Sequence, residues 1–170
     1  LDKTIFHPQG GGQPHDKGFM ESLDGKTKFE VAEMKDVAGK IQHAGKYANG
    51  TQFTVGQEVK LLVDAEFRKL HARVHSAGHL LDMAMNRAGK KELKPGKGYH
   101  FVEGPYVEYI GVVDEKERES LIGVLNKHCA DIIAEAKAAD QKVFKKMCTY
   151  EEAQKELAGA GGVPPYVKEG

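Results

Sequence analysis

The chain of 170 residues has few cysteines, no net charge and no long hydrophobic run. Its two cysteines, Cys129 and Cys148, are too few for a disulfide scaffold or a four-cysteine metal site, and they fit a reducing compartment, so we expect a cytoplasmic protein. Lysine plus arginine equal aspartate plus glutamate at 25 each, which argues against coating of nucleic acid by bulk charge. No apolar run approaches the ~18 residues of a membrane-spanning helix, so we expect no membrane partner.

The N-terminus lacks an initiator methionine and the charged and apolar regions of a secretory signal peptide. We therefore expect these residues to be part of a longer protein. Hydrophobic residues make up 40% of the chain and charged residues 29%, which predicts a folded protein and not a disordered one. The length suits one domain or two small ones.

The pattern of the chain changes near residue 65. Before that point, strand-length runs are bounded by glycine, aspartate or asparagine, and they cover residues 4–6, 28–34, 40–43 and 57–63. We interpret residues 1–64 as a β-rich subdomain, a small antiparallel sheet or barrel-like part, and residues 65–170 as a second domain. The predicted fold class is α+β, in which an antiparallel sheet and two long helices make up the second domain.

In the second part, apolar residues at three- and four-residue spacing predict an amphipathic helix from Glu66 to about Gly89. Its predicted buried stripe consists of Phe67, Leu70, Val74, Ala77, Leu81, Ala84 and Ala88. A second long helix is predicted from Asp114 to about Ala139. The remaining predicted elements are a turn over 95–98, strands near 100–102, 106–110 and 142–147, a short helix over 150–157 and a loop over 159–165.

Three of the eight histidines lie four residues apart on the first helix: His71, His75 and His79. They share a face at roughly 100–180° from Leu70, off the predicted apolar stripe. Two imidazoles at this spacing can converge on one zinc ion, but all three cannot, so the pair is either His71/His75 or His75/His79. The other interpretation is that these histidines are ordinary core or surface residues that bind no metal. The metalloprotease motif is excluded, because no glutamate follows His75.

A second motif, Gly10-Gly11-Gly12-Gln13, follows the first predicted strand. A flexible turn is its ordinary interpretation, because glycine readily adopts positive φ. A phosphate-binding P-loop is excluded, since no Gly-Lys-Ser/Thr follows at the required spacing. The motif otherwise indicates a close backbone approach to a bound molecule, with the amide of Gln13 beside it.

Together the two motifs resemble those of the alanyl-tRNA editing family. Residues 4–18, TIFHPQGGGQPHDKG, resemble its glycine motif, residues 68–81 with HSAGH resemble its HxxxH helix, and residues 53–64 resemble the strand pair before that helix. The resemblance is closest to the free-standing AlaX-type proteins, since these 170 residues contain no aminoacylation domain. The editing domain of threonyl-tRNA synthetase shares HxxxH but not the glycine–glutamine motif.

The resemblance implies a trans-editing hydrolase that removes serine or glycine from mischarged tRNA for alanine. It also implies a zinc ion held by His75 and His79 and by the Cys and His of a later CxxxH motif. No CxxxH follows His79 in this chain, so we expect the remaining ligands beyond Gly170 and a second domain that is incomplete at its C-terminus. The alternative is a tRNA-binding or regulatory module whose editing site is degenerate and inactive.

The implied reaction is ester hydrolysis at the acceptor end of the tRNA, without ATP. Gln13 would hydrogen-bond the substrate or the attacking water, beside the zinc-binding histidines. Backbone amides of the three glycines would approach the developing oxyanion; these are Gly10, Gly11 and Gly12.

Two further contacts with the substrate are expected. Thr4 would bind the hydroxyl of serine, although an ordinary strand residue is equally compatible with its position. Such a contact would favour serine, because a site built to bond a hydroxyl strongly rejects the analogue without it. Lys94 and Lys97 belong to a lysine-rich segment after the histidine helix and are candidates for phosphate contacts.

Overall fold

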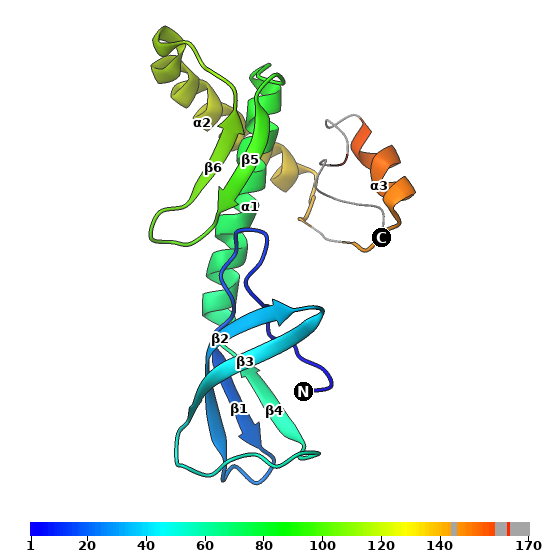
Figure 1. Ribbon diagram of the computed structural model, residues 1–170. Helices are drawn as coiled ribbons and strands as arrows, with labels where there is room; N and C mark the ends of the chain where they lie inside the picture. The colour runs from blue at the N-terminus through cyan, green and yellow to red at the C-terminus, as the bar shows by residue number, and fades with distance from the viewer. Residues whose placement is uncertain (144–145, 159–162, 164–170) are drawn as a thin grey trace.

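A computed structural model describes residues 1–143, 146–158 and 163. Within them the elements follow the order β1 (Gly18–Ser22), β2 (Lys28–Val37), β3 (Lys40–Tyr47), β4 (Val59–Val63), α1 (Ala65–Arg87), β5 (Lys94–Tyr99), β6 (Tyr106–Ile110), α2 (Glu115–Ala138) and α3 (Tyr150–Leu157). Figure 1 shows the four N-terminal strands at one end of α1, and the β5–β6 hairpin and α2 beside the rest of that helix. The fold class is therefore α+β, as predicted.

The N-terminal strands form an antiparallel sheet in the order β3-β2-β1-β4. Since β3 and β4 lie at opposite edges, the sheet is open, and the expectation of a barrel-like part is corrected to an open sheet. A small apolar core is formed by Met20, Val31 and Met34 of β1 and β2 together with Phe6. The loop before β1 thus contributes Phe6 to the same core as the strands.

Two N-terminal segments differ from the sequence prediction. Residues 4–6 are irregular and not a strand, whereas the unpredicted strand β1 pairs with both β2 and β4. A Cβ atom on Gly18 would lie 2.1 Å from the carbonyl oxygen of Leu62, so only glycine permits this approach of β4. The buried positions of β1 are Gly18, Met20 and Ser22, so no alternation of hydrophobic residues marked it as a strand.

Helix α1 lies close to its predicted bounds. Asp64 caps its N-terminus by accepting a hydrogen bond from the Phe67 amide at 2.9 Å. The helix ends just before Gly89, whose φ of 76° favours glycine.

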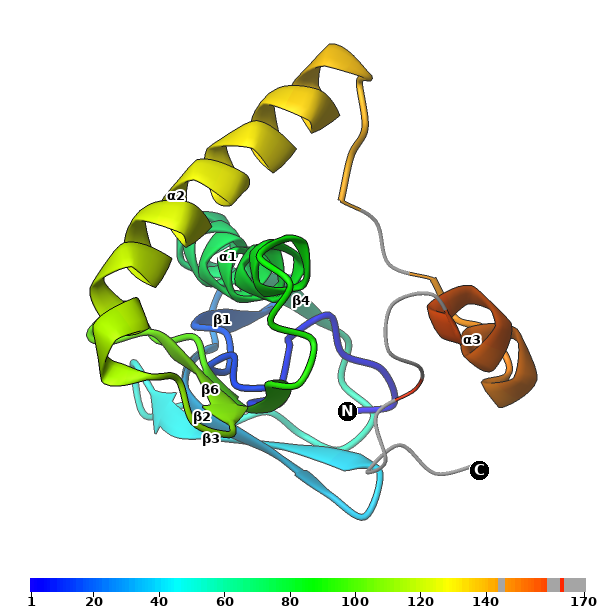
Figure 2. The ribbon, with the colours of Figure 1, turned by 90° about the horizontal axis from the view of Figure 1, so that it is seen from above.

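The buried face of α1 is rotated from the predicted stripe. Its buried residues are His71, Gly78, Ala84 and Met85, whereas Leu70 remains 47% exposed. The reason is tertiary: α1 contacts α2, β5 and β6, and Gly11 of the glycine loop approaches His75. In Figure 2, which views the helix nearly end-on, α2 passes along one side of it.

The second half of the chain also departs from prediction in places. Residues 95–98, predicted as a turn, lie within β5, which pairs with β6 through an irregularity between Pro95 and Gly98. Strand β6 and the helices α2 and α3 are confirmed, whereas residues 100–102 are not a strand. Of the predicted strand over 142–147, the described residues are irregular, and residues 144–145 lie outside the description, as does most of the predicted loop 159–165. Among the described residues, no helix is long and apolar enough to span a membrane.

Candidate functional site

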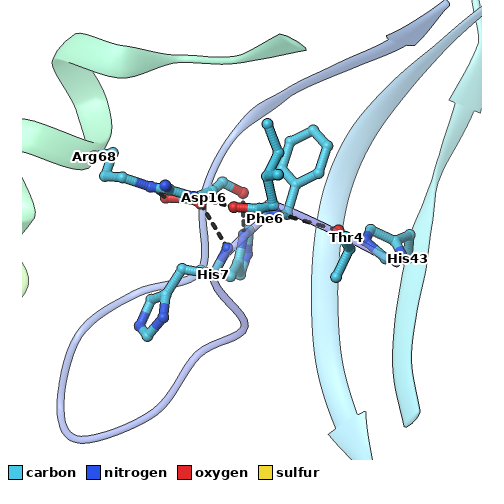
Figure 3. A network of polar contacts seen from close by, with 8 residues as sticks. Thr4, Phe6, His7, Asp16, His43 and Arg68 are labelled. Atoms are coloured by element: carbon cyan, nitrogen blue, oxygen red, sulfur yellow. Dashed lines mark hydrogen bonds and ion pairs between the residues drawn. The ribbon is translucent and has the colours of Figure 1, made fainter. Parts of the chain in front are cut away.

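The segment before β1 is closed on itself and fastened to α1 by an ion pair between Arg68 and the buried carboxylate of Asp16 (Figure 3). Asp16 is 1% exposed and accepts hydrogen bonds from the His7 amide at 2.6 Å and from Nε of Arg68 at 3.0 Å, with a second bond from Nη2 of Arg68. The same Nη2 donates to the Ile5 carbonyl at 2.6 Å. The hydrogen bond to Asp16 raises the pKa of Arg68. We call this set of contacts the Arg68–Asp16 latch.

Within that segment the glycine motif forms a tight turn. Gly10 and Gln13 exchange backbone hydrogen bonds of 3.2 and 3.0 Å across it. Gly11 and Gly12 between them have φ values of 57° and 79°, which glycine adopts at no steric cost. The turn directs Gln13 back toward α1.

Gln13 meets the histidine helix directly. Its side chain is buried, and its Oε1 lies 3.1 Å from Nδ1 of His75. Because an amide oxygen can only accept, His75 donates from Nδ1 and keeps the lone pair on Nε2. The expectation that Gln13 faces the helix at His75 is therefore confirmed. Burial lowers the pKa of His75, and the neighbouring imidazoles of His100 and His79 lower it further.

The second histidine of the HxxxH pair is more exposed and has an acidic neighbour. Nδ1 of His79 lies 3.5 Å from Oδ2 of Asp82, and the hydrogen bond to this carboxylate raises the pKa of His79. Asp82 in turn accepts a 2.7 Å hydrogen bond from the hydroxyl of Tyr109 on β6. Burial and this carboxylate together raise the pKa of Tyr109.

The third histidine of the helix has a different environment. His71 is buried, its ring lies tilted against that of Phe67 with centroids 4.1 Å apart, and it donates from Nδ1 to the Phe67 carbonyl at 2.9 Å. The expectation that His71 lies off the buried face is wrong, because the face that packs is centred nearer Gly78 than Leu70. These contacts give His71 a structural role and favour His75/His79 as the pair.

A cavity of about 650 Å³ opens between the glycine loop, α1 and the β5–β6 hairpin. Among the predicted site residues, it is lined by Gly10, Gly11, Gly12, His75, His79 and Lys97. Gln13 touches the cavity only through His75, and Lys94 is not among its lining residues. Thr4 is not either: its hydroxyl lies 3.0 Å from Nε2 of His43 on β3 and accepts from the Phe6 amide (Figure 3).

One histidine that sequence reasoning missed also lines this cavity. His100 is 5% exposed, and its ring stacks on that of His75 with centroids 4.4 Å apart and planes 14° apart. It follows β5 directly and is not spaced regularly from the other histidines. The one sequence feature that could have indicated the place of His100 was the glycine at position 98, which leaves room for its ring, but that glycine was interpreted as part of a turn.

The two HxxxH histidines fit one half of a zinc site. Their ring centroids are 5.0 Å apart, and each has its Nδ1 next to an oxygen, Gln13 Oε1 or Asp82 Oδ2, which is how such partners orient metal-binding imidazoles. The described part of the chain contains no cluster of three or more histidine, cysteine or acidic residues able to hold a metal. A complete zinc site would therefore need ligands from outside the described residues.

Comparison with known proteins supports the resemblance seen in the motifs. The family model of class II (A) tRNA synthetases matches residues 1–67. The alanyl-tRNA editing protein AlaX-M of Pyrococcus horikoshii is 35% identical over 131 residues, which cover 75% of this chain and 57% of that protein. AlaX-L of the same organism is 37% identical over 51% of this chain and 21% of its own length.

The alanine–tRNA ligase of Archaeoglobus fulgidus is 37% identical over 48% of this chain, which corresponds to 8% of the ligase. The chain thus spans a little over half of AlaX-M and smaller shares of the other two relatives. The similarity covers the glycine motif and agrees with the meeting of Gln13 and His75 at one cavity. The chain is therefore a homologue of alanyl-tRNA editing proteins.

Proposed function

We propose that this chain carries the hydrolytic site of a protein that removes wrongly attached serine or glycine from tRNA for alanine. The observation that carries the proposal is the hydrogen bond between Gln13 and His75, which joins the two sequence motifs at one cavity. The names of the relatives, alanyl-tRNA editing proteins and alanine–tRNA ligases, support the same substrate class. We place the protein in the cytoplasm, where the free thiols of Cys129 and Cys148 stay reduced.

In this reaction the chain's own residues orient the ester and its attacking water. Gln13 holds His75 in one tautomer and so acts on the substrate through the His75 ring, which lines the cavity. The Gly10 amide is already bonded to the Gln13 carbonyl, so the amides of Gly11 and Gly12 are the candidates for the oxyanion. His75 stays neutral near pH 7 because its pKa is lowered, and it therefore presents a lone pair and not a charge.

Zinc would be held by Nε2 of His75 and His79 together with ligands outside the described residues, and when bound it would polarise the ester carbonyl or activate water. Asp82 would fix the ring of His79 through Nδ1, as Gln13 fixes that of His75. Removal of either partner is expected to weaken metal binding ~10–100-fold, the usual effect of losing such an outer contact.

Contacts with the tRNA would be local, because the chain as a whole is neutral. Lys97 lines the cavity and Lys94 lies nearby on β5, and both side chains are exposed. Each phosphate contact would release counterions, so binding should weaken as salt is added. Two such contacts predict a shallow salt dependence, with log Kd rising by about 1.4 for each tenfold increase in salt for a single-stranded acceptor end.

A deacylation assay with serine-, glycine- and alanine-charged tRNA for alanine tests the proposal. We expect the zinc-loaded protein to hydrolyse the two wrong esters faster than alanyl-tRNA, and Gln13→Ala to slow both reactions. Binding of the tRNA without hydrolysis of any ester would favour the alternative, a tRNA-binding or regulatory module with an inactive site.

A further inference from the structure

His100 is held at the junction of three separate elements. Its backbone amide donates to the Gly12 carbonyl at 2.8 Å, which ties the end of β5 to the glycine loop. Its side chain is buried and lies between that loop and α1. The residue thus connects both sequence motifs, although it belongs to neither.

The ring of His100 occupies a niche formed by glycines from these elements. A Cβ atom on Gly12 would lie 2.9 Å from its Cδ2, one on Gly78 would lie 2.5 Å from its Cε1, and one on Gly98 would lie 2.7 Å from its Nε2. Real Cβ atoms do not approach other atoms to less than 3.0 Å, so a side chain on any of the three would push the ring away. Gly78 lies in the interior of α1, where alanine would otherwise be preferred.

On its open side the ring of His100 lies against His75. The two imidazoles are nearly parallel, with planes 14° apart and centroids at 4.4 Å, and His79 stacks next on His75 at 5.0 Å. The hydrogen bond from His75 Nδ1 to Gln13 restrains one atom of the ring, but it tolerates some rotation of the ring plane, because hydrogen bonds form over a range of angles. A flat neighbour within stacking distance removes this rotation.

We propose that His100, seated in the niche of Gly12, Gly78 and Gly98, is a positioning residue that fixes the ring plane in which His75 presents Nε2 to the cavity. The proposal rests on the proposed function for its catalytic meaning, but the orientation of His75 can be measured without any activity. Gln13 sets the tautomer of His75, and His100 sets the plane of its ring.

The experiment uses the whole chain with ¹⁵N-labelled histidine and compares the wild type with His100→Ala and Gly78→Ala. The His75 ring signals are assigned by their loss in His75→Gln. In both test variants we expect the His75 ring protons to lose the shift caused by the stacked ring. We also expect kcat for seryl-tRNA hydrolysis to fall ~10–100-fold, as for loss of other residues that orient a ligand, while KM stays the same.

A matched control is His71→Ala. It removes an equally buried imidazole, this one from α1, the helix that carries His75; its ring packs against Phe67 and does not line the cavity. A general loss of stability would therefore appear in both histidine variants, whereas a changed His75 signal should appear only without His100. If His100→Ala does not fold, Gly78→Ala supplies the same measurement, because it adds one methyl group and improves helix propensity.

The double variant Gly78→Ala/His100→Ala separates packing from positioning. Removing the ring relieves the clash, so the double variant should be more stable than Gly78→Ala alone and yet have the low kcat of His100→Ala. The proposal is overturned if the His75 signals do not change in His100→Ala, or if His71→Ala changes them equally. Displaced His75 signals together with an inactive wild type would contradict the proposed function and leave the positioning role in place.

Discussion

Breaking the Arg68–Asp16 latch should loosen the glycine loop and uncouple Gln13 from His75. The change is Arg68→Ala, which removes the arginine partner of the buried Asp16 carboxylate and keeps its hydrogen bond from the His7 amide. Removing one partner of a buried pair costs ~3–5 kcal/mol of folding free energy. Because the Arg68 side chain is 38% exposed, we expect the lower limit, about 3 kcal/mol.

Denaturant unfolding of Arg68→Ala, Asp16→Ala and the double variant measures this effect. The double variant no longer contains an unpaired buried charge, so its loss of stability should be smaller than the sum of the two single losses. The control is Arg87→Ala, which removes an arginine of the same helix with an equally direct but exposed carboxylate partner, Glu135. We expect little change in the free energy of unfolding of Arg87→Ala, since exposed ion pairs contribute little to stability.

The same variants connect the latch to the site. Because the latch fastens residues 5–16 to α1, its loss should lower kcat for seryl-tRNA hydrolysis under conditions where the protein is still folded. The reasoning would be refuted if the losses of stability of Arg68→Ala and Asp16→Ala added up in the double variant, or if Arg87→Ala lost as much stability as Arg68→Ala.

The remaining predictions concern zinc binding, the loss of stability at high pH and the expected contact of Thr4 with the serine hydroxyl. His75→Ala and His79→Ala should each lower the zinc content of the protein, whereas His71→Ala should not; equal content in all three, measured by elemental analysis, would contradict the assignment. The pKa of Tyr109 is raised in the folded state, so the free energy of unfolding should fall as the pH rises above about 10, the pKa of tyrosine in the unfolded chain. Denaturant unfolding at pH 9 and 11 should show a smaller decrease in this free energy for Tyr109→Phe than for the wild type. Thr4→Val should lower stability by about 1 kcal/mol through lost hydrogen bonds and leave the serine/alanine rate ratio unchanged; a narrowed ratio would place Thr4 at the substrate.

The elements with strong local signals were predictable from the sequence. Helix α1 has a capping aspartate, a regular apolar repeat and a glycine after its end, and its predicted bounds differ from the observed ones by one or two residues. The meeting of Gln13 with the HxxxH helix was also predictable, because both motifs must act on one substrate.

What could not be predicted depends on contacts between distant segments. Leu70 belongs to the most regular apolar stripe of α1, yet the hairpin packs elsewhere on the helix, and His71 is buried while Leu70 stays exposed. Strand β5 contains Pro95 and two glycines, which are typical of a turn, and it becomes a strand only by pairing with β6. His100 has no motif of its own, and the three glycines that enclose it are far apart in sequence.

The division of the chain near residue 64 stays a prediction. The segment before β1 accepts hydrogen bonds from Arg68 and His75 of α1 and from the His100 amide after β5, so the cavity combines residues from both predicted parts.

The central claim is that Gln13 and the HxxxH histidines form one hydrolytic site for mischarged tRNA. The most direct measurement is the single-turnover deacylation rate of serine- and alanine-charged tRNA for alanine, with zinc-loaded wild-type protein, Gln13→Ala, His75→Ala and the double variant. We predict faster hydrolysis of the serine ester by the wild type, slower hydrolysis by each single variant, and no further loss in the double variant, since the two residues act as one unit. Hydrolysis of neither ester above the uncatalysed rate by the wild type, or fully additive losses from the two substitutions, would contradict the claim.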